Sequence, residues 1–306
     1  MADILAVGIA TLDIINSVDG YPAEDSEVRA MSQRLCRGGN ATNTLTILSQ
    51  LGHRSHWAGV LADEPDAHHI ITALARQQIN TSAVLTQHGG KVPTSYILHN
   101  VRNGSRTIVH HRDLPEYPFS AFEKIDLTPL AWVHFEGRNT AETQRMLARC
   151  KQQHPTLTCS LEIEKERPQI DTLFPLADLL LFSRAFARQR GFDSATAFLS
   201  AMQKRAPGKN LICAWGEEGA YGLDNHDDFH YSPAFAPDEL VDTLGAGDTF
   251  NAGVIDAQLK GLSMKESLRR GCQLAGQKCG HHGLEFIAPN QPILDNGEEN
   301  DRDIRP

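Results

Sequence analysis

Residues 243–251 read TLGAGDTFN, and this stretch constrains the fold more than any other. Three small residues, Gly245, Ala246 and Gly247, lead into a lone acid, Asp248, and a helical pattern starts directly behind it. The first N–H groups of a helix have no partner within the helix, and its N-terminus carries roughly half a positive charge. Because the glycines leave this backbone bare, the stretch predicts an anion site that can hold phosphate.

Asp248 has two interpretations. A carboxylate beside a bound phosphate can accept the proton of an attacking hydroxyl, and such general-base help contributes about 10²–10⁴ in rate. Alternatively, Asp248 only caps the helix, since Asp is favoured near a helix start. The stretch GAGD alone leaves both open. It is not a dinucleotide fingerprint, because Phe250 stands where a Gly or Ala is needed.

A second polar cluster, RGGNATN, occupies residues 37–43. The glycine pair ending at Gly39 allows a tight turn or a close ligand approach. Asn40 and Asn43 are three residues apart at an expected helix start, so they share one face, and each amide offers donors and an acceptor. Asp13, just after the expected first strand, adds a carboxylate. The set suits a polyol, although Asn40 as a helix cap and Asp13 as a turn residue remain alternatives.

Composition excludes several classes of function. The 306 residues carry a formal net charge of −9, so there is no basic surplus to neutralise nucleic-acid phosphates. No run of about 18 apolar residues is present, so we expect no membrane span. The N-terminal residues predict a first strand and not a signal peptide. The six cysteines show no CxxC spacing, which favours reduced thiols in the cytoplasm.

Short apolar runs alternate with helical patterns along most of the chain, which predicts βα units and a mostly parallel sheet covered on both faces. Strands are expected at 4–7, 57–61, 132–135, 158–163, 179–183 and 211–215. Helices are expected around 45–51 (closing at Gly52), over 67–78, 140–153 and 248–260, and from Ser263, with Glu266 completing a capping box, to near Gly280.

Residues 14–37 and 92–112 depart from this alternation of strands and helices. Both stretches are strand-like, polar and rich in turn residues, with no helical pattern between their pieces. We expect them to form a small lid of antiparallel strands, and ordinary long loops are the alternative. The predicted organisation is an α/β core over 1–13, 38–91 and 113–290, a β lid over 14–37 and 92–112, and a disordered acidic tail over 291–306.

With GGN near residue 40 and DTLGAGDTF near residue 248, the chain resembles the PfkB/ribokinase family of ATP-dependent sugar and nucleoside kinases. The likeness spans nearly the whole chain. GAGD marks the wide family, whereas DSEVR, EGRN and AWGEEGA are narrower and point to members that phosphorylate a ketohexose. The stretches that carry the likeness to the family are DGYPAEDSEVRAMSQRLCRGGNATN, GSRTIVHH, VHFEGRN, LEIEK, AWGEEGA, VDTLGAGDTFNA and GCQLAGQKCG.

This resemblance implies a ribokinase-like doubly wound α/β fold with a β-strand lid. It also implies a homodimer joined through the lids, and transfer of the γ-phosphate of ATP to the C1 hydroxyl of D-fructose. A related kinase acting on another sugar or a nucleoside is the alternative. A sugar-binding regulator without catalysis is a further one, and the intact Asp248, glycines and Arg106 speak against it.

The resemblance also implies roles for single residues. Asp248 matches the catalytic base, and the anion hole matches Gly245, Ala246 and Gly247. The sugar contacts match Asp13, Gly39, Asn40 and Asn43. Arg106 matches an arginine that reaches the nucleotide phosphates, and a nucleotide-binding loop matches Gly216, Glu217, Glu218 and Gly219. Without the resemblance, Arg106 reads as a surface charge of the lid and the last four residues as a polar turn.

The motif that marks the magnesium region in many family members is missing from this sequence. Mg²⁺ is implied as the companion of ATP, but the N-x-x-E motif that many members carry is absent, since residues 183–186 read SRAF. Glu162 and Glu164 are candidates, with alternating charges on the solvent edge of a strand as the alternative. The resemblance also implies a monovalent cation such as K⁺ in the loop where this chain has Asp242 and Thr243.

Overall fold

A computed structural model describes residues 1–287, so the tail predicted to be disordered lies outside the described residues. Its main feature, the large sheet, has eight strands in the order β14-β13-β12-β11-β10-β9-β1-β4, in which the pairs β12–β13 and β13–β14 are antiparallel and the other pairs are parallel. The strands are β1 (Asp3–Val7), β4 (Arg54–Ala58), β9 (Trp132–Glu136), β10 (Thr158–Ile163), β11 (Leu179–Ser183), β12 (Asn210–Ala214), β13 (Ala220–Leu223) and β14 (Phe229–Ser232).

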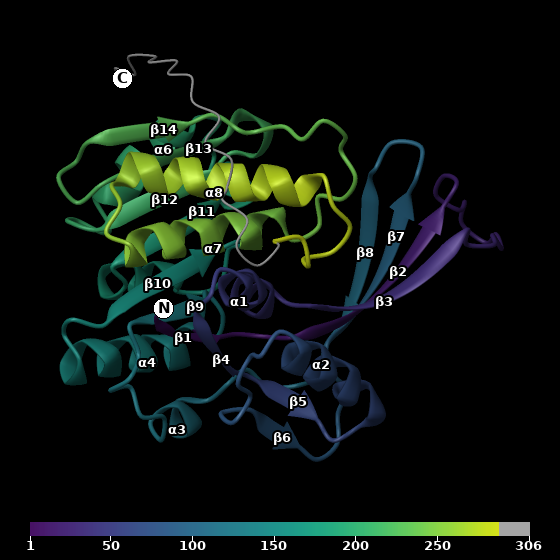
Figure 1. The fold of residues 1–306 in the computed structure, drawn as a ribbon, viewed down its shortest axis with the longest axis horizontal. Coiled ribbons are helices and arrows are strands. Elements are labelled where there is room, and N and C mark those ends of the chain that lie inside the picture. Colours follow the sequence, from purple (N-terminus) through teal and green to yellow (C-terminus); the bar gives the residue numbers. More distant parts are fainter. Residues whose placement is uncertain (288–306) are drawn as a thin grey trace.

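Helices cover this sheet. The interior strand β9 is buried at all five positions, as expected when both faces of a parallel sheet are covered. Figure 1 shows α1, α7 and α8 packed together over one face. The helices are α1 (Asn40–Gln50), α2 (Pro65–Arg76), α3 (Phe119–Phe122), α4 (Thr140–Gln153), α5 (Arg184–Gln189), α6 (Ala195–Gln203), α7 (Ala246–Leu259) and α8 (Met264–Cys279), with 3₁₀ turns at Ile170–Leu176 and Gly216–Glu218. The predicted doubly wound α/β fold is confirmed.

A separate small sheet projects to the side of the large sheet (Figure 1). Its strands, in the order β3-β2-β7-β8, are β2 (Thr11–Val18), β3 (Ser32–Gly38), β7 (Thr94–Asn100) and β8 (Arg106–His111). Strands were expected in both stretches, but the all-antiparallel arrangement is wrong, because the central pair β2–β7 is parallel. The chain runs through α1, β4 and α2 between them, so no hairpin fixes their direction. That this sheet acts as a lid stays a prediction.

The single strand predicted at 57–61 is also wrong. Gly59 separates β4 from β5 (Val60–Ala62), and β5 leaves the large sheet to pair with β6 (Leu85–Gln87). A Cβ at Gly59 would lie 2.2 Å from the Trp57 ring, so only a glycine fits where the chain changes sheets. At the other end of the chain, the predicted capping box is confirmed: Ser263 caps α8 with Glu266.

Candidate active site

Two glycines bring the first strand of the small sheet against the start of α1. A Cβ at Gly38 would lie 2.2 Å from Oδ2 of Asp13, so this glycine leaves room for the carboxylate. Gly39 is the N-cap of α1, with φ 106°, and a Cβ there would lie 2.2 Å from the carbonyl oxygen of Ile9. Both a left-handed backbone and a close approach therefore require glycine at residue 39.

The structure brings Asn43 and Asp248 together although 205 residues separate them. Helices α1 and α7 pack side by side, and Nδ2 of Asn43 donates to Oδ2 of Asp248 at 2.7 Å. The N-cap of α7 is Gly245, and Asp248 makes no side-chain capping bond. Asp248 lies in the first turn of α7 but does not cap the helix through a side-chain hydrogen bond, and its role as the base stays a prediction.

Arg37, to which we assigned no role from the sequence, orients this pair. Its Nη1 donates to Oδ1 of Asn43 at 2.9 Å and to Oγ1 of Thr42 at 2.6 Å, and its Nη2 donates to Oγ1 of Thr46 at 2.8 Å. Because the guanidinium holds the amide oxygen of Asn43, the amide NH₂ faces Asp248. Burial lowers the pKa of Arg37 to about 10, so the group stays charged at neutral pH. Its signal in the sequence was its place directly before the two glycines.

The charge state of Asp248 suits a base that works near neutral pH. The pKa of Asp248 is raised to about 7: burial is the largest cause, the hydrogen bond from Asn43 opposes the rise, and the negative charges of Glu136 and Glu164 add to it. Oδ2 is held by Asn43, whereas Oδ1 accepts no hydrogen bond from residues 1–287. One carboxylate oxygen is therefore free to take a proton, and its pKa is close to the optimum for that task.

The anion site predicted at the α7 N-terminus has two open donors. The amide of Ala246 donates to the Thr243 carbonyl at 3.3 Å, whereas the amides of Gly247 and Asp248 meet no acceptor in the described part of the chain. A Cβ at Gly247 would find no atom within 4 Å, so the space beside it is open. Gly245 has φ 81°, and a Cβ there would lie 2.9 Å from Leu284. The backbone amides of Gly247 and Asp248 are thus the open donors, whereas the amide of Ala246 is already hydrogen-bonded to Thr243.

Asp13 does not directly follow the first strand, as we expected, because β1 ends at Val7 and Asp13 lies within β2. Its buried carboxyl accepts a hydrogen bond from Oγ1 of Thr11 at 2.8 Å. Burial raises the pKa of Asp13, and hydrogen bonds from Thr11 and Ser95 oppose that rise. Asp13 thus lies beside the glycine turn at the start of α1, and its role as a sugar contact stays a prediction.

Asn40 faces a different set of partners. Its Nδ2 lies 3.1 Å from Oε1 of Glu162 and 3.3 Å from Oε2 of Glu164. Glu162 is buried, so the solvent-edge interpretation is wrong for it, and its Oε2 has no hydrogen-bond partner in the described structure. Burial and the negative charge of Asp248 raise its pKa well above the usual value. Nearby, Oε1 of Glu136 accepts from the amides of Ile9 and Ala41 at 3.1 and 2.8 Å.

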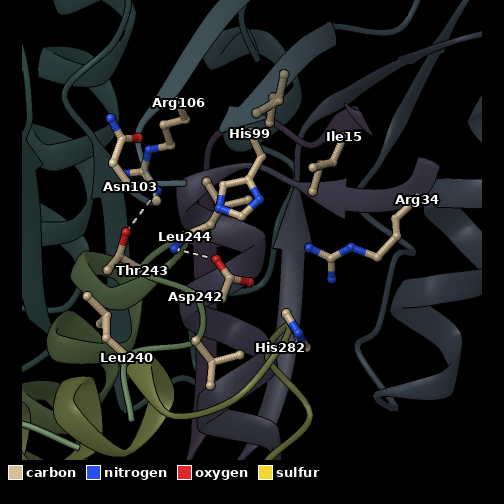
Figure 2. Close-up of a pocket in the computed structure, with 13 residues that line it drawn as sticks. Ile15, Arg34, His99, Asn103, Arg106, Leu240, Asp242, Thr243, Leu244 and His282 are labelled. Carbon is tan, nitrogen blue, oxygen red and sulfur yellow. Dashed lines mark hydrogen bonds between the residues drawn. The ribbon is translucent and has the colours of Figure 1, made fainter. Parts of the chain in front are cut away.

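A pocket of about 170 Å³ lies between the small sheet and the loop before α7. Figure 2 shows Arg106 reaching from β8 toward Thr243, with Arg34 directed into the pocket from the opposite side. Nη1 of Arg106 donates to Oγ1 of Thr243 at 3.3 Å. Arg106 is exposed, as expected for a surface charge of the small sheet, and it points at the loop that leads into the anion site. Its contact with phosphate stays a prediction.

The segment Gly216–Gly219 follows β12 at the carboxyl edge of the large sheet. Gly216 and Gly219 have φ 70° and 104°, and a Cβ at Gly219 would lie 2.1 Å from the Ser232 carbonyl oxygen. Arg184, in the place of the missing N-x-x-E motif, donates to Oε1 of Glu217 at 2.9 Å. The described hydrogen bonds of this segment do not reach Asp248 or Asn43, so the structure does not join it directly to the other candidates.

The cation predictions can be tested against the donor atoms. No group of three acidic, His or Cys residues within 1–287 is placed to hold a metal by itself. Mg²⁺ often uses only one or two carboxylates plus substrate phosphates, and the unpartnered Oε2 of Glu162 fits that pattern. K⁺ does not fit at Asp242, because its carbonyl oxygen and Oδ2 already face the ammonium of Lys278 at 2.7 and 3.3 Å. Among the described helices, none has the length and apolar character needed to cross a membrane.

Comparisons with known proteins identify the family of the chain. The model of the pfkB family carbohydrate kinases matches residues 1–291. Ketohexokinase of Mus musculus is 44% identical over 292 residues, which cover 93% of this chain and 98% of the mouse protein. Fructosamine kinase FrlD of Bacillus subtilis is 25% identical over 258 residues, which cover 80% of this chain and 84% of its own length.

Solved structures show the same fold. Ribokinase of Giardia lamblia aligns with a TM-score of 0.84 at 15% identity, over 96% of this chain and 98% of its own. Arabidopsis thaliana ribokinase, solved with ribose and ATP, aligns with a TM-score of 0.77 at 16% identity, over 92% and 94% of the two chains. At such identities the likeness concerns the fold alone. The family match and the mouse relative go further: the chain belongs to the pfkB family of carbohydrate kinases.

Proposed function

We propose that this carbohydrate kinase transfers the γ-phosphate of ATP to the C1 hydroxyl of D-fructose and so forms fructose 1-phosphate. The observation that carries the proposal is the contact between Asn43 and Asp248 beside open helix amides. It joins a group suited to a polyol, a base with a pKa of about 7 and a phosphate site. The mouse relative at 44% identity, a ketohexokinase, supports a ketohexose as the acceptor.

In the proposed reaction, fructose binds against Asp13, Gly39, Asn40 and Asn43. Oδ1 of Asp248 accepts the proton of the C1 hydroxyl while that oxygen bonds to the γ-phosphorus, and the bond from phosphorus to the β–γ bridging oxygen breaks. ADP leaves with the bridging oxygen. The amides of Gly247 and Asp248 stabilise the charge on the transferring phosphoryl group.

The remaining candidates bind the nucleotide. Arg106 lies on β8 beside the loop into the anion site, where a fixed guanidinium can pair with phosphate oxygens. We assign the Gly216–Gly219 turn to the nucleotide because two residues with positive φ, Gly216 and Gly219, bend its backbone at the carboxyl edge of the sheet.

Mg²⁺ would reach the site with ATP and neutralise part of the charge on its phosphates. We assign Glu162, with Glu164 next along the chain, as the protein side of that site. Glu162 offers a buried oxygen without a partner, and Asn40 links both carboxylates to the expected sugar site. A Glu162→Gln variant should therefore need more Mg²⁺ for half-maximal turnover. An unchanged Mg²⁺ requirement would remove Glu162 from the site.

A substrate panel tests the function. Purified protein is given ATP, Mg²⁺ and, in turn, fructose, ribose, adenosine or no acceptor, and ADP release is followed in a coupled assay. The position of the phosphate is read by ³¹P and ¹³C NMR. The proposal expects the highest kcat/KM with fructose and phosphate on C1. A preference for ribose or adenosine, or phosphate on another carbon, would contradict it. Sugar-dependent thermal stabilisation with no ADP formed would identify a binding protein instead.

A further inference from the structure

Lys278 has no place in the site described so far, yet it is a fully buried lysine in α8. Its Nζ donates to the carbonyl oxygens of Asp242 and His281 at 2.7 and 3.2 Å and lies 3.3 Å from Oδ2 of Asp242. An ammonium group has three N–H donors, so each of them faces an oxygen. This lysine is thus enclosed by oxygen atoms in the manner of a bound cation.

The loop that Lys278 holds leads directly into the anion site. Oδ1 of Asp242 accepts from the Leu244 amide at 2.9 Å, and its Oδ2 accepts from the Gly283 amide at 3.3 Å. The amides of Val241 and Asp242 donate to the Cys279 carbonyl at 2.8 and 3.1 Å. The ammonium is therefore the centre of a set of bonds that fastens the segment before Gly245 to the end of α8.

A charge at this position does more than fill space. Burying an ammonium is unfavourable unless oxygens surround it, so an apolar side chain would have been the simpler filler. Two of the bound oxygens are carbonyls, which a cation holds more strongly than a neutral donor does. The ammonium is also hydrogen-bonded to Asp242, three positions before the N-cap of α7. Negative charge builds up at that end of α7 in the proposed reaction.

We propose that Lys278 is a positioning residue that acts as a built-in cation: its ammonium fixes the Asp242–Leu244 loop and thereby sets the open amides of Gly247 and Asp248 for phosphoryl transfer. The inference rests on the proposed kinase reaction. It accounts for the misfit of K⁺ at Asp242, because the protein supplies a cation at these oxygens from its own chain.

The test compares three variants of the full chain. Lys278→Ala leaves a space lined by oxygens that a small cation can enter, and Lys278→Gln keeps a hydrogen-bond donor without charge. Lys151→Ala is the matched control, because Lys151 also donates to a backbone carbonyl, that of Leu157, and to a carboxylate, that of Asp178, away from the anion site. For each variant we would measure thermal unfolding, kcat, and KM for ATP and fructose, with chloride salts of ammonium, methylammonium, K⁺ or tetramethylammonium.

We expect both Lys278 variants to lose roughly tenfold or more in kcat with smaller changes in KM, since transition-state donors are displaced. Ammonium, methylammonium or K⁺ should raise kcat of Lys278→Ala beyond their effect on the wild type. Tetramethylammonium, which is too large for the space, should not, and the Lys151 control should show neither effect.

The proposal is overturned when Lys278→Gln turns over within about twofold of the wild type, or when no small cation raises the turnover of a folded Lys278→Ala protein. If Lys278→Ala does not fold, the Gln variant decides alone. A wild type that releases no ADP with any sugar would instead contradict the kinase reaction itself, so the two failures are distinguishable.

Discussion

Asp248 carries two opposing influences in one side chain. Burial raises the pKa of its carboxyl and the amide of Asn43, which donates to Oδ2, opposes the rise, so that the pKa lies at about 7. The group is therefore kept near the balance between its two protonation states at neutral pH. Arg37 fixes the direction of the Asn43 amide, so the properties of the base depend on a residue that does not touch it.

The raised pKa of Asp248 predicts how the stability of the protein depends on pH. The folded pKa of Asp248 lies above its ordinary value of 3.8, so its protonated form is the one that folding favours. Its contribution to stability is fully present below about pH 4 and is lost as the pH rises through about 7. Asp248→Asn removes this loss. We expect thermal unfolding to show a larger gain for the variant at about pH 8 than at about pH 5.

Asp224→Asn provides a control of opposite sign. Burial, which raises the pKa of Asp224, is outweighed by its bonds to His230 and to two backbone amides, so its pKa is lowered. The stabilisation by this carboxylate is present above its unfolded pKa, so Asp224→Asn should lower the melting temperature at both pH values. An equal gain for Asp248→Asn at the two pH values would show that its carboxyl is not protonated by burial.

At the scale of elements, the start of α1 is held by a backbone that only glycine adopts freely. Gly39 combines φ 106° with a Cβ position 2.2 Å from the Ile9 carbonyl oxygen, which is backbone and cannot move aside. This contact sets α1 against the strand that carries Asp13. The site therefore depends on how two elements meet as well as on the side chains they present.

Gly39→Ala should destabilise the protein by about 3 kcal/mol, combining left-handed strain with a backbone clash. Gly52, at the other end of α1, is the matched control, because it has φ 88° but a Cβ there would meet nothing within 4 Å. Gly52→Ala should therefore cost only about 1 kcal/mol. Urea unfolding of the two variants measures the difference, and equal losses would mean that the turn relaxes around the new methyl group.

The sequence predicts elements well where a local pattern decides them. The strand 158–163 and the helix 140–153 are found within the predicted bounds, because apolar runs and helical spacing are local signals. The end of β4 at Gly59 could not be predicted from the local pattern. The chain changes sheets there because β5 pairs with β6, which is distant in the sequence. Lys278 was missed for the same reason, since its partner Asp242 is 36 positions away. Arg37 was missed although its partners lie within nine positions, because the residue pattern does not show which way its guanidinium turns.

At the scale of the molecule, the small sheet has two different faces. Ile15 and Ile97 are buried on the face that lines the pocket. On the other face, Leu35, Ile14, Tyr96 and Val109 are paired across all four strands in one apolar row. Leu35 and Val109 expose 53% and 65% of their surface, which is unusual for an apolar row unless another surface covers it.

We propose that a second copy of the chain covers this row, so that two small sheets form a homodimer. Val109→Glu places a charge in the middle of such an interface and should give a monomer in light scattering at concentrations where the wild type is dimeric. Leu262→Glu, at an exposed apolar residue between α7 and α8, is the control and should leave the mass unchanged. A monomeric wild type would contradict the proposal.

The most direct test of the central claim, that Asp248 is the base in phosphoryl transfer to fructose, is the turnover of Asp248→Asn. The amide oxygen of the new asparagine can take the place of Oδ2 and accept from Asn43, so the local geometry should survive while the ability to take a proton is lost. The account predicts that ADP release with fructose falls by about 10²–10⁴ while calorimetry shows fructose binding within a few-fold of the wild type. Near-normal turnover of this variant would contradict it.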